Sequence, residues 1–263
     1  MKRVQIIIPS INLWTKYTKD CIDSVFNQKT ENEYRILFID NASTDETLIE
    51  AGKLVSDKFS HKRNEERWSF SQSVNHGVND AWERGYDYAL VLNNDIILHS
   101  QALDELVKRF ESADESIGMV SCLDIRGEVD TVGIESISNK QGVPESEHPN
   151  FSAFMINKTC WDRVGEFDEV FRPAYWEDND IHYRINLAGL KAICLPTAMF
   201  YHFGSRTQNE AENSPICSSP QFEKNAKYYC DKWGGLPPNE KFIKPFNREE
   251  NTLKSTEQNG IIR

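Results

Sequence analysis

The sequence predicts an α/β protein with a mostly parallel, open sheet flanked by helices and a helical appendage at its C-terminal end. Three observations indicate this fold. Short apolar, β-branched runs have the composition of strands that are buried on both faces of a sheet. Segments between these runs carry apolar residues at helical spacing. Strands that alternate with helices favour parallel pairing, because a parallel pair needs a crossover connection.

The first unit is a strand, a loop and a helix. Residues 4–8 form a continuous β-branched run that ends at Pro9, and residues 15–28 carry apolar side chains at helical spacing. A basic start before an apolar run also resembles a signal peptide. The run is too short for one, and Pro9 interrupts it, so a first strand is the better interpretation.

The second unit repeats this pattern. Residues 34–39 predict a strand that ends at Asp40, and Thr44 or Asp45 is suited to cap the next helix. We expect the inner face of that helix to carry Leu48, Ala51, Leu54 and Val55. A third helix is expected over residues 71–84 and a buried strand over residues 88–92, which leads directly into Asn93, Asn94 and Asp95.

The rest of the chain divides into a second half of the domain, a helical segment and a tail. Residues 124–150 are rich in Gly, Pro, Ser and Glu, which predicts a loop or small hairpin. Its placement suggests an insertion that faces a substrate, the acceptor of a transferred group. We expect strands over 118–123, 151–156, 192–195 and 198–203, and helices from Ser100, over 158–164 and over 177–190. The domain therefore spans residues 1–207, with halves 1–123 and 124–207.

A last helix is expected in residues 208–236. It begins at Ser219-Pro220, because Pro is favoured at the first helical position. Its inward side chains are expected to be Phe222, Ala226, Tyr229 and Trp233. Residues 237–263 are polar and without periodicity, which predicts a flexible tail.

Composition admits an enzyme and argues against several other classes. The 263 residues can bury a sizeable core, and a net charge of -11 argues against long nucleic acid as a partner. No apolar run reaches the length of a transmembrane helix, so any membrane contact is expected to be peripheral. The six cysteines form no C-x-x-C pair, which favours free thiols in a reducing cytoplasm over a zinc or redox site.

Polar segments follow the predicted strands and are expected to share one edge of the sheet. Ligands of open α/β sheets bind beyond the carboxyl ends of the strands, where residues 9–12, 40–45 and 93–95 fall. The segment at residues 93–95 would by itself more often be a turn. At this edge, Asp95 is suited to hold Mg²⁺ or Mn²⁺, which prefer oxygen ligands and accept phosphates and waters as the remainder.

Carboxylates cluster at the start of the helix expected from residue 177. Glu177, Asp178 and Asp180 lie within four residues of one another. They are either a solvated helix start, stabilised by the helix dipole, or a general base that removes a proton from an attacking hydroxyl. Tyr175 and Trp176 beside them would stack on a sugar or belong to the core.

His202 ends a predicted strand just before a small-residue turn. A single His in that position is more often structural than a ligand. Near a metal-bound diphosphate it would supply a metal ligand or a phosphate contact. Arg206 would neutralise phosphate charge there or lie in solvent.

In their order and approximate spacing, these motifs resemble a family 2 glycosyltransferase of the GT-A fold, over residues 1–207. The Asn-Asn-Asp form of the usual Asp-x-Asp motif is similar to that of rhamnosyltransferase-like members. The motifs are Ile8-Pro9-Ser10, residues 38–45, Phe70-Ser71, Asn75-His76-Gly77, residues 92–95, 164–169 and 177–180, and His202.

The resemblance implies an inverting, metal-dependent enzyme. It would move a sugar from a UDP- or dTDP-linked donor to a hydroxyl group of a glycan or other acceptor. The half at 1–123 would bind the nucleotide-sugar, through Pro9, Ser10, Ile11, Asn12, Asp40, Ser71, Asn75, Asn93, Asn94 and Asp95. The half at 124–207 would bind the acceptor and carry catalysis.

The resemblance also implies a role for each remaining motif residue. Asp178 would be the catalytic base, supported by Glu177, and Asp95 and His202 would lie at the metal, which is Mn²⁺ or Mg²⁺. Asp40 would accept a hydrogen bond from the ring NH of the base. Residues 63–68 depart from the family pattern because they lack its usual glycine.

Three other classes were weighed against this interpretation. A nucleotidyltransferase would carry a glycine-rich phosphate loop with a basic residue near the first strand, and residues 9–16 lack one. A dehydrogenase would carry G-x-G-x-x-G after that strand, which is also absent. A catalytically silent nucleotide-sugar-binding protein of the same fold stays open, although Asp95 and Asp178 are both present.

Overall fold

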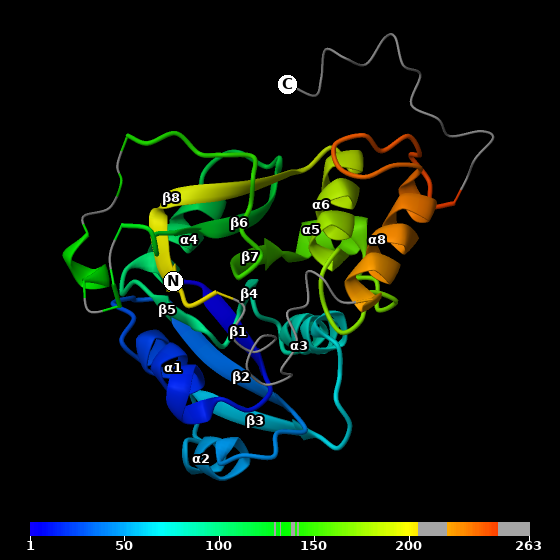
Figure 1. Ribbon diagram of the computed structural model, residues 1–263. Coiled ribbons are helices and arrows are strands. Elements are labelled where there is room, and N and C mark those ends of the chain that lie inside the picture. Colours follow the sequence, from blue (N-terminus) through cyan, green and yellow to red (C-terminus); the bar gives the residue numbers. More distant parts are fainter. Residues whose placement is uncertain (129, 132, 138–139, 141, 205–219, 247–263) are drawn as a thin grey trace.

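The computed structural model describes residues 1–263 except 129, 132, 138–139, 141, 205–219 and 247–263 (Figure 1). The described part contains an eight-stranded sheet in the order β3-β2-β1-β4-β7-β6-β8-β5. The strands are β1 (Arg3–Ser10), β2 (Glu33–Asn41), β3 (Phe59–Asn64), β4 (Tyr88–Leu92), β5 (Ile96–Leu98), β6 (Ile117–Asp124), β7 (Ala153–Asn157) and β8 (Lys191–His202).

The sheet is mostly parallel, as predicted. The pairs β1-β2, β2-β3, β1-β4 and β6-β8 are parallel. β7 runs antiparallel to β4 and β6, and β5 runs antiparallel to β8. The carboxyl ends of β1, β2 and β4 therefore meet at one edge, which brings residues distant in sequence to the same place.

Helices cover both faces of this sheet (Figure 1). They are α1 (Lys19–Phe26), α2 (Thr47–Lys53), α3 (Phe70–Glu83), α4 (Ala102–Phe110), α5 (Lys158–Val164), α6 (Glu177–Leu187) and α8 (Pro220–Trp233), with a π-helical turn η1 (Trp14–Thr18) before α1 and a 3₁₀ turn η2 (Ile134–Ser136).

Alternation along the strands creates two hydrophobic cores. Ile6 of β1 belongs to a core with side chains of α1, α2 and α4, and its neighbour Ile7 belongs to a core with side chains of α3, α5 and α6. Successive side chains of a strand point to opposite faces, so one β-branched run supplies both layers. This explains why the run at residues 4–8 is apolar on both faces apart from Gln5, whose buried side chain donates to the carbonyl of Gly77 and to Asp80.

The expected helix starts are largely confirmed. The helix expected over 158–164 is α5, whose cap Asn157 accepts from the backbone N–H of Cys160. The helix expected from residue 71 is α3, which begins with a reciprocal capping box between Ser69 and Gln72. Capping boxes satisfy two otherwise unpaired donors at once.

Several elements differ from the expectation. β3 and β5 were not predicted, because β3 is a largely polar edge strand and β5 has only three residues. The segments 192–195 and 198–203 belong to one strand, β8, and Pro196 is accommodated at a shift in register opposite β6. The predicted inner face of α2 was wrong for Leu48, which lies within the helix but is 40% exposed. It was also wrong for Val55, which is 61% exposed because α2 ends before it, at Lys53.

The C-terminal helix is present, but its buried face is partly polar. Tyr229 and Trp233 are buried as expected, together with Asn225 and Lys232, which the apolar pattern did not predict. The rest of the helical segment, at residues 208–219, and the end of the tail, at 247–263, lie outside the described residues. Residues 124–150, as far as they are described, form irregular loop with η2 and one isolated bridge between Ser146 and Cys194.

Two further expectations concern the whole chain. Within the ranges described above, no helix combines the length and the apolar character needed to cross a bilayer.

The five described cysteines are free thiols, and four of them are buried. Burial raises the pKa of the Cys160 thiol to about 12, so this thiol is unreactive. Cys217 lies outside the described residues.

Candidate active site

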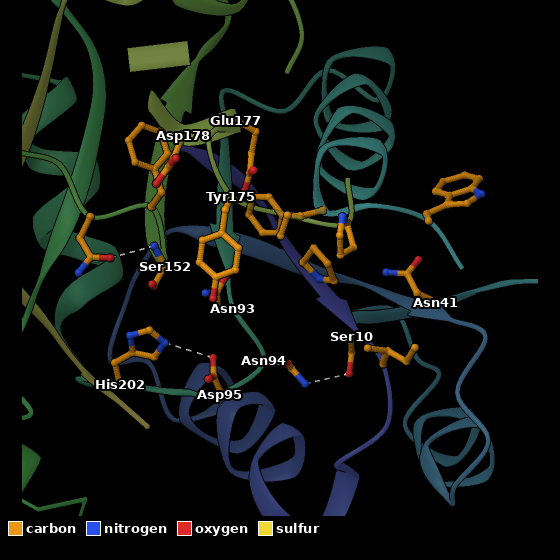
Figure 2. Close-up of a pocket in the computed structure, with 18 of the residues that line it drawn as sticks. Ser10, Asn41, Asn93, Asn94, Asp95, Ser152, Tyr175, Glu177, Asp178 and His202 are labelled. Atoms are coloured by element: carbon orange, nitrogen blue, oxygen red, sulfur yellow. Dashed lines mark hydrogen bonds and ion pairs between the residues drawn. The ribbon is translucent and has the colours of Figure 1, made fainter. Parts of the chain in front are cut away.

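A cavity of about 440 Å³ opens at the carboxyl edge of the sheet (Figure 2). It collects most of the residues that the sequence singled out, from both halves of the domain. Those that line it are Pro9, Ser10, Ile11, Asn93, Asn94, Asp95, Tyr175, Glu177, Asp178 and His202. A cavity with convergent polar groups at this edge is the expected place for a ligand of an α/β sheet.

Asn94 ties the end of β4 to the end of β1. Its amide nitrogen donates to Ser10 Oγ at 3.1 Å and to Thr18 Oγ1 at 2.9 Å, and all three side chains are buried. The backbone N–H of Asn93 donates to the carbonyl of Ser152 at 2.8 Å. The strand end that carries Asp95 is therefore held from two sides, which makes Asn94 a positioning group.

Asp95 and His202 converge at one end of the cavity. Antiparallel pairing of β5 with β8 places Ile96 opposite His202, and His202 Nε2 lies 3.4 Å from Asp95 Oδ1. This buried nitrogen makes no hydrogen bond to any residue that the structure describes. On the other side of the ring, Asp124 Oδ2 lies 3.8 Å from Nδ1 and is placed to orient it.

These two side chains fit a divalent cation. A carboxylate oxygen and an orphaned imidazole nitrogen that face each other are a suitable pair of ligands for Mn²⁺. No group of three or more His, Cys, Asp and Glu side chains suited to a metal occurs among the described residues. The remaining ligands would have to come from a substrate and water, which is usual where a metal binds phosphates.

Glu177 and Asp178 line the opposite side of the cavity, at the start of α6 (Figure 2). Burial raises the pKa of Glu177 well above its ordinary range, and the neighbouring charge of Asp178 raises it further. Burial in the cleft also raises the pKa of Asp178, but backbone N–H groups, including that of Asn179 at 2.8 Å, oppose the shift. Burial therefore favours the neutral form of Glu177, whereas the backbone N–H groups favour the anionic form of Asp178.

Tyr175 and Trp176 precede these carboxylates in an unusual backbone conformation. Both have positive φ, 75° for Tyr175 and 78° for Trp176. Bulky side chains are rare in this left-handed region. Tyr175 lines the cavity and projects between Asp178 and Asn93 (Figure 2). Trp176 instead packs on Phe222 and Tyr229.

Four of the predicted nucleotide-binding residues lie outside the cavity lining: Asn12, Asp40, Ser71 and Asn75. Asn12 accepts from the backbone N–H of Thr44 at 2.7 Å. Ser71 is fully buried, and Asn75 donates to the carbonyl of Phe167 at 2.9 Å. Asn12 and Asn75 therefore make hydrogen bonds that hold the fold together.

Asp40 is fully buried beside the side chains of Arg63 and His61. Arg63 Nη1 lies 2.5 Å from its Oδ2, and His61 Nε2 lies 3.9 Å away. Burial would raise the pKa of Asp40, but contacts with His61, Ser43 and Arg63 outweigh it and lower the pKa to about 2. Asp40 is therefore a permanent anion behind the cavity wall.

Sequence reasoning missed about half of the lining. The additional residues come from the end of β2, the start of α3 and three loops: Asn41, Arg67, Trp68, Phe70, His148, Pro149, Asn150, Phe151, Ser152, Pro173 and Ala174. Residues 148–152 are held in place partly by Ser121, whose hydroxyl accepts from the backbone N–H of Asn150 at 2.8 Å. Loop residues carry no periodicity, so only the aromatic and basic character of Arg67 and Trp68 could have indicated them.

Comparison with known proteins identifies the class. Residues 5–164 match the model of the family described as glycosyl transferase family 2. The match covers more than half of the chain, and the chain belongs to this family. No curated protein matches the chain significantly.

Solved structures share the fold. GalNAc-T7, solved with UDP, GalNAc and Mn²⁺, superposes with a TM-score of 0.70 at 18% identity, over 89% of this chain and 49% of that one. The mannosyltransferase PcManGT of Pyrobaculum calidifontis, solved with GDP-Man and Mn²⁺, gives 0.58 at 18% identity, over 76% and 56%. TarS of S. aureus, residues 1–349 solved with UDP, gives 0.59 at 17% identity, over 76% and 60%.

These likenesses establish the GT-A glycosyltransferase fold that the sequence predicted. The chain spans about half to three fifths of the length of these solved structures. The family match ends at residue 164, before α6 and α8.

Proposed function

We propose that this chain is an inverting glycosyltransferase that moves a sugar from a UDP- or dTDP-linked donor to an acceptor hydroxyl. The observation that carries the proposal is that Asp95 with His202 and Asp178 with Glu177 line opposite sides of one cavity (Figure 2). In-line substitution at a sugar carbon needs the leaving group and the base on opposite sides of that carbon. The fold is the one on which GalNAc-T7 is seen with UDP, GalNAc and Mn²⁺.

The donor end of the cavity would be the metal end. Asp95 and His202 would hold Mn²⁺ or Mg²⁺, which neutralises the charge that develops on the departing diphosphate. Pro9, Ser10 and Ile11 at the end of β1 would border the nucleotide. The other predicted nucleotide-binding residues lie outside the cavity lining: Asn12, Asp40, Ser71 and Asn75. They would contact the nucleotide only if it extended past the cavity wall or displaced their present hydrogen-bond partners.

The acceptor end would be the carboxylate end. Asp178 would take the proton of the acceptor hydroxyl. At the same time the hydroxyl oxygen would bond to the anomeric carbon, and the bond from that carbon to the diphosphate would break. Glu177 would stay protonated beside it, which leaves the single negative charge on Asp178. The acceptor, a glycan or another hydroxyl-bearing molecule, would lie against Tyr175, with Trp176 supporting the turn.

The same proposal includes a donor that binds through the metal. It also includes a cytoplasmic location, which the free thiols favour. A catalytically silent nucleotide-sugar-binding protein is the alternative, and the two differ in turnover. The first experiment is a screen of UDP-, dTDP- and GDP-sugars with Mn²⁺, with release of the nucleoside diphosphate as the readout.

The decisive variant is Asp178→Asn, which keeps the shape of the side chain and removes its basicity. We expect transfer to fall by about 10²- to 10⁴-fold, because general-base catalysis contributes that much, with donor affinity unchanged. Asp57→Asn, at an exposed loop position, is the matched control. Near-normal transfer by Asp178→Asn would remove Asp178 as the base, and no turnover by the wild-type chain would favour the silent binding protein.

A further inference from the structure

The turn that leads into α6 needs an external support. Tyr175 and Trp176 are consecutive aromatic residues with φ of 75° and 78°. Such a conformation costs free energy for residues with a large side chain, so the surrounding structure must hold it. The first hydrogen bond of α6 runs from the N–H of Asp180 to the carbonyl of Trp176, so the turn also sets where the helix begins.

Asn225 of α8 supplies that support. Its side-chain nitrogen lies 3.2 Å from the carbonyl oxygen of Arg172, 3.1 Å from that of Ala174 and 3.1 Å from that of Tyr175. Asn225 is only 3% exposed, so these carbonyls gain a partner that water would not readily replace. Gln221 donates to Asn225 Oδ1 at 3.0 Å, which orients the amide with its nitrogen toward the turn.

A second contact fixes the same helix to the first turn of α6. Trp233 Nε1 donates to Asp180 Oδ1 at 2.8 Å, and Lys232 Nζ lies 2.6 Å from the same oxygen. Lys232 also pairs with Asp168 at 2.7 Å. The C-terminal end of α8 therefore lies against the start of α6 (Figure 1), and Asn225 is the point at which α8 touches the backbone of the turn.

We propose that Asn225 is a positioning residue for the active site. By holding the carbonyls of residues 172, 174 and 175, it keeps Tyr175 directed into the cavity and sets the position of Glu177 and Asp178 at the start of α6. The inference rests on the proposed function, because it treats these carboxylates as the catalytic ones. It extends the site to a helix that lies outside the segment matched by the family model.

Asn225→Asp is the sharpest test, since it keeps the volume of the side chain but turns an oxygen toward three carbonyl oxygens. We expect faster hydrogen exchange at the amides of residues 174–180, with exchange in β1 and β4 unchanged. We expect kcat to fall by about 10- to 100-fold, because small misplacements of catalytic groups have effects of that size. Affinity for UDP with Mn²⁺ should stay unchanged, because Asp95 and His202 lie in other elements.

Two further variants keep the test interpretable. Gln221→Ala removes only the group that orients the Asn225 amide, and we expect a smaller effect in the same direction, with a melting temperature close to that of the wild type. Lys224→Ala, on the exposed face of α8, is the matched control and should leave both exchange and kcat unchanged.

Either of two results would overturn the inference. One is wild-type exchange over residues 174–180 in Asn225→Asp, and the other is faster exchange there without a loss of kcat. Failure of the proposed function gives a different result, namely normal transfer by Asp178→Asn, so the two failures are distinguishable.

Discussion

At the residue scale, the fully buried carboxylate of Asp40 and the half-buried one of Asp178 differ in what their neighbours supply. Arg63 and His61 lie beside Asp40, and the pKa of Asp40 is lowered to about 2. Asp178 is shifted in the opposite direction by burial, with only backbone N–H groups to oppose the shift. A proton acceptor must bind its proton well enough to remove it from a hydroxyl, so Asp178 is the better suited of the two.

The raised pKa of Asp178 predicts a cost in stability. A carboxyl whose pKa is higher in the folded than in the unfolded chain loses stabilisation as the pH rises from its ordinary value, about 3.9, through the folded value. Above that window the buried anion opposes folding, so Asp178→Asn should melt at a higher temperature than the wild type at pH 7. The gain should vanish as the pH is lowered toward 4.

Melting curves of Asp178→Asn, the wild type and the exposed control Asp57→Asn across this pH range measure the effect. A variant that is less stable than the wild type at neutral pH would contradict the account of Asp178 as a destabilised anion. The comparison does not depend on finding a substrate.

Asp95 and His202 yield a prediction about the metal. Asp95→Ala should abolish the Mn²⁺-dependent part of UDP binding, because it removes the carboxylate that faces the orphaned imidazole nitrogen. His202→Gln should weaken it by about ten-fold or more, or ~1.4 kcal/mol. Calorimetric titration of UDP with and without Mn²⁺ measures both. Equal affinities in the two conditions for the wild-type chain would remove the metal site.

At the element scale, the close contact of α3 with β1 depends on one glycine. A Cβ on Gly77 would lie 2.5 Å from Ile7 Cγ2 and 2.8 Å from Ile7 Cγ1. Ile7 is fully buried and branched at Cβ, so it has little room to move. Only a residue without a side chain lets the helix approach this closely, and this approach sets the distance between α3 and the cavity edge of the sheet.

Gly77→Ala should therefore destabilise the fold by about 1–3 kcal/mol, which is typical of overpacking a core. Gly52→Ala is the matched control, since nothing lies within 4 Å of a Cβ at that helical position. There the substitution should be neutral or stabilising by about 0.5–1 kcal/mol, because alanine favours helix. Urea unfolding measures both, and an equal effect of the two substitutions would contradict the contact with Ile7.

At the scale of the whole molecule, the cavity joins segments that are far apart in the sequence. Ser10 and Asp95 come from the first hundred residues, whereas Tyr175, Asp178 and His202 follow after residue 170. A ligand in this cavity contacts segments that separate on unfolding. Its binding should therefore stabilise the whole chain and not one half alone.

Thermal shift measures this coupling and selects the nucleotide. At one hundred times its dissociation constant, a ligand adds about 2.7 kcal/mol to the free energy of unfolding, which for a chain of this size is roughly 5–10 °C. We expect UDP or dTDP with Mn²⁺ to produce this shift and a chelator to remove it. A shift in melting temperature that is equally large with the chelator would contradict a metal-bridged diphosphate. If GDP gives the largest shift, the donor is GDP-linked and not UDP- or dTDP-linked.

Much of the fold was predictable because its signals are local. The β-branched runs, the capping residues and the proline at the start of α8 each act within a few residues, so the mostly parallel sheet and most helices followed from them. β3 and β5 escaped, because an edge strand and a three-residue strand carry too little apolar pattern.

The sequence by itself determined the family, the order of most elements and the short motifs that hold Asp95 and Asp178. Only the tertiary structure decided which polar side chains bind other parts of the chain. Asp40 pairs with Arg63, Asn75 donates to the carbonyl of Phe167, and Asn225 donates to the turn before α6. It also decided which loops complete the cavity. Strand and helix patterns repeat within one element, whereas contacts between residues 23 or more positions apart, such as these, depend on how the elements pack.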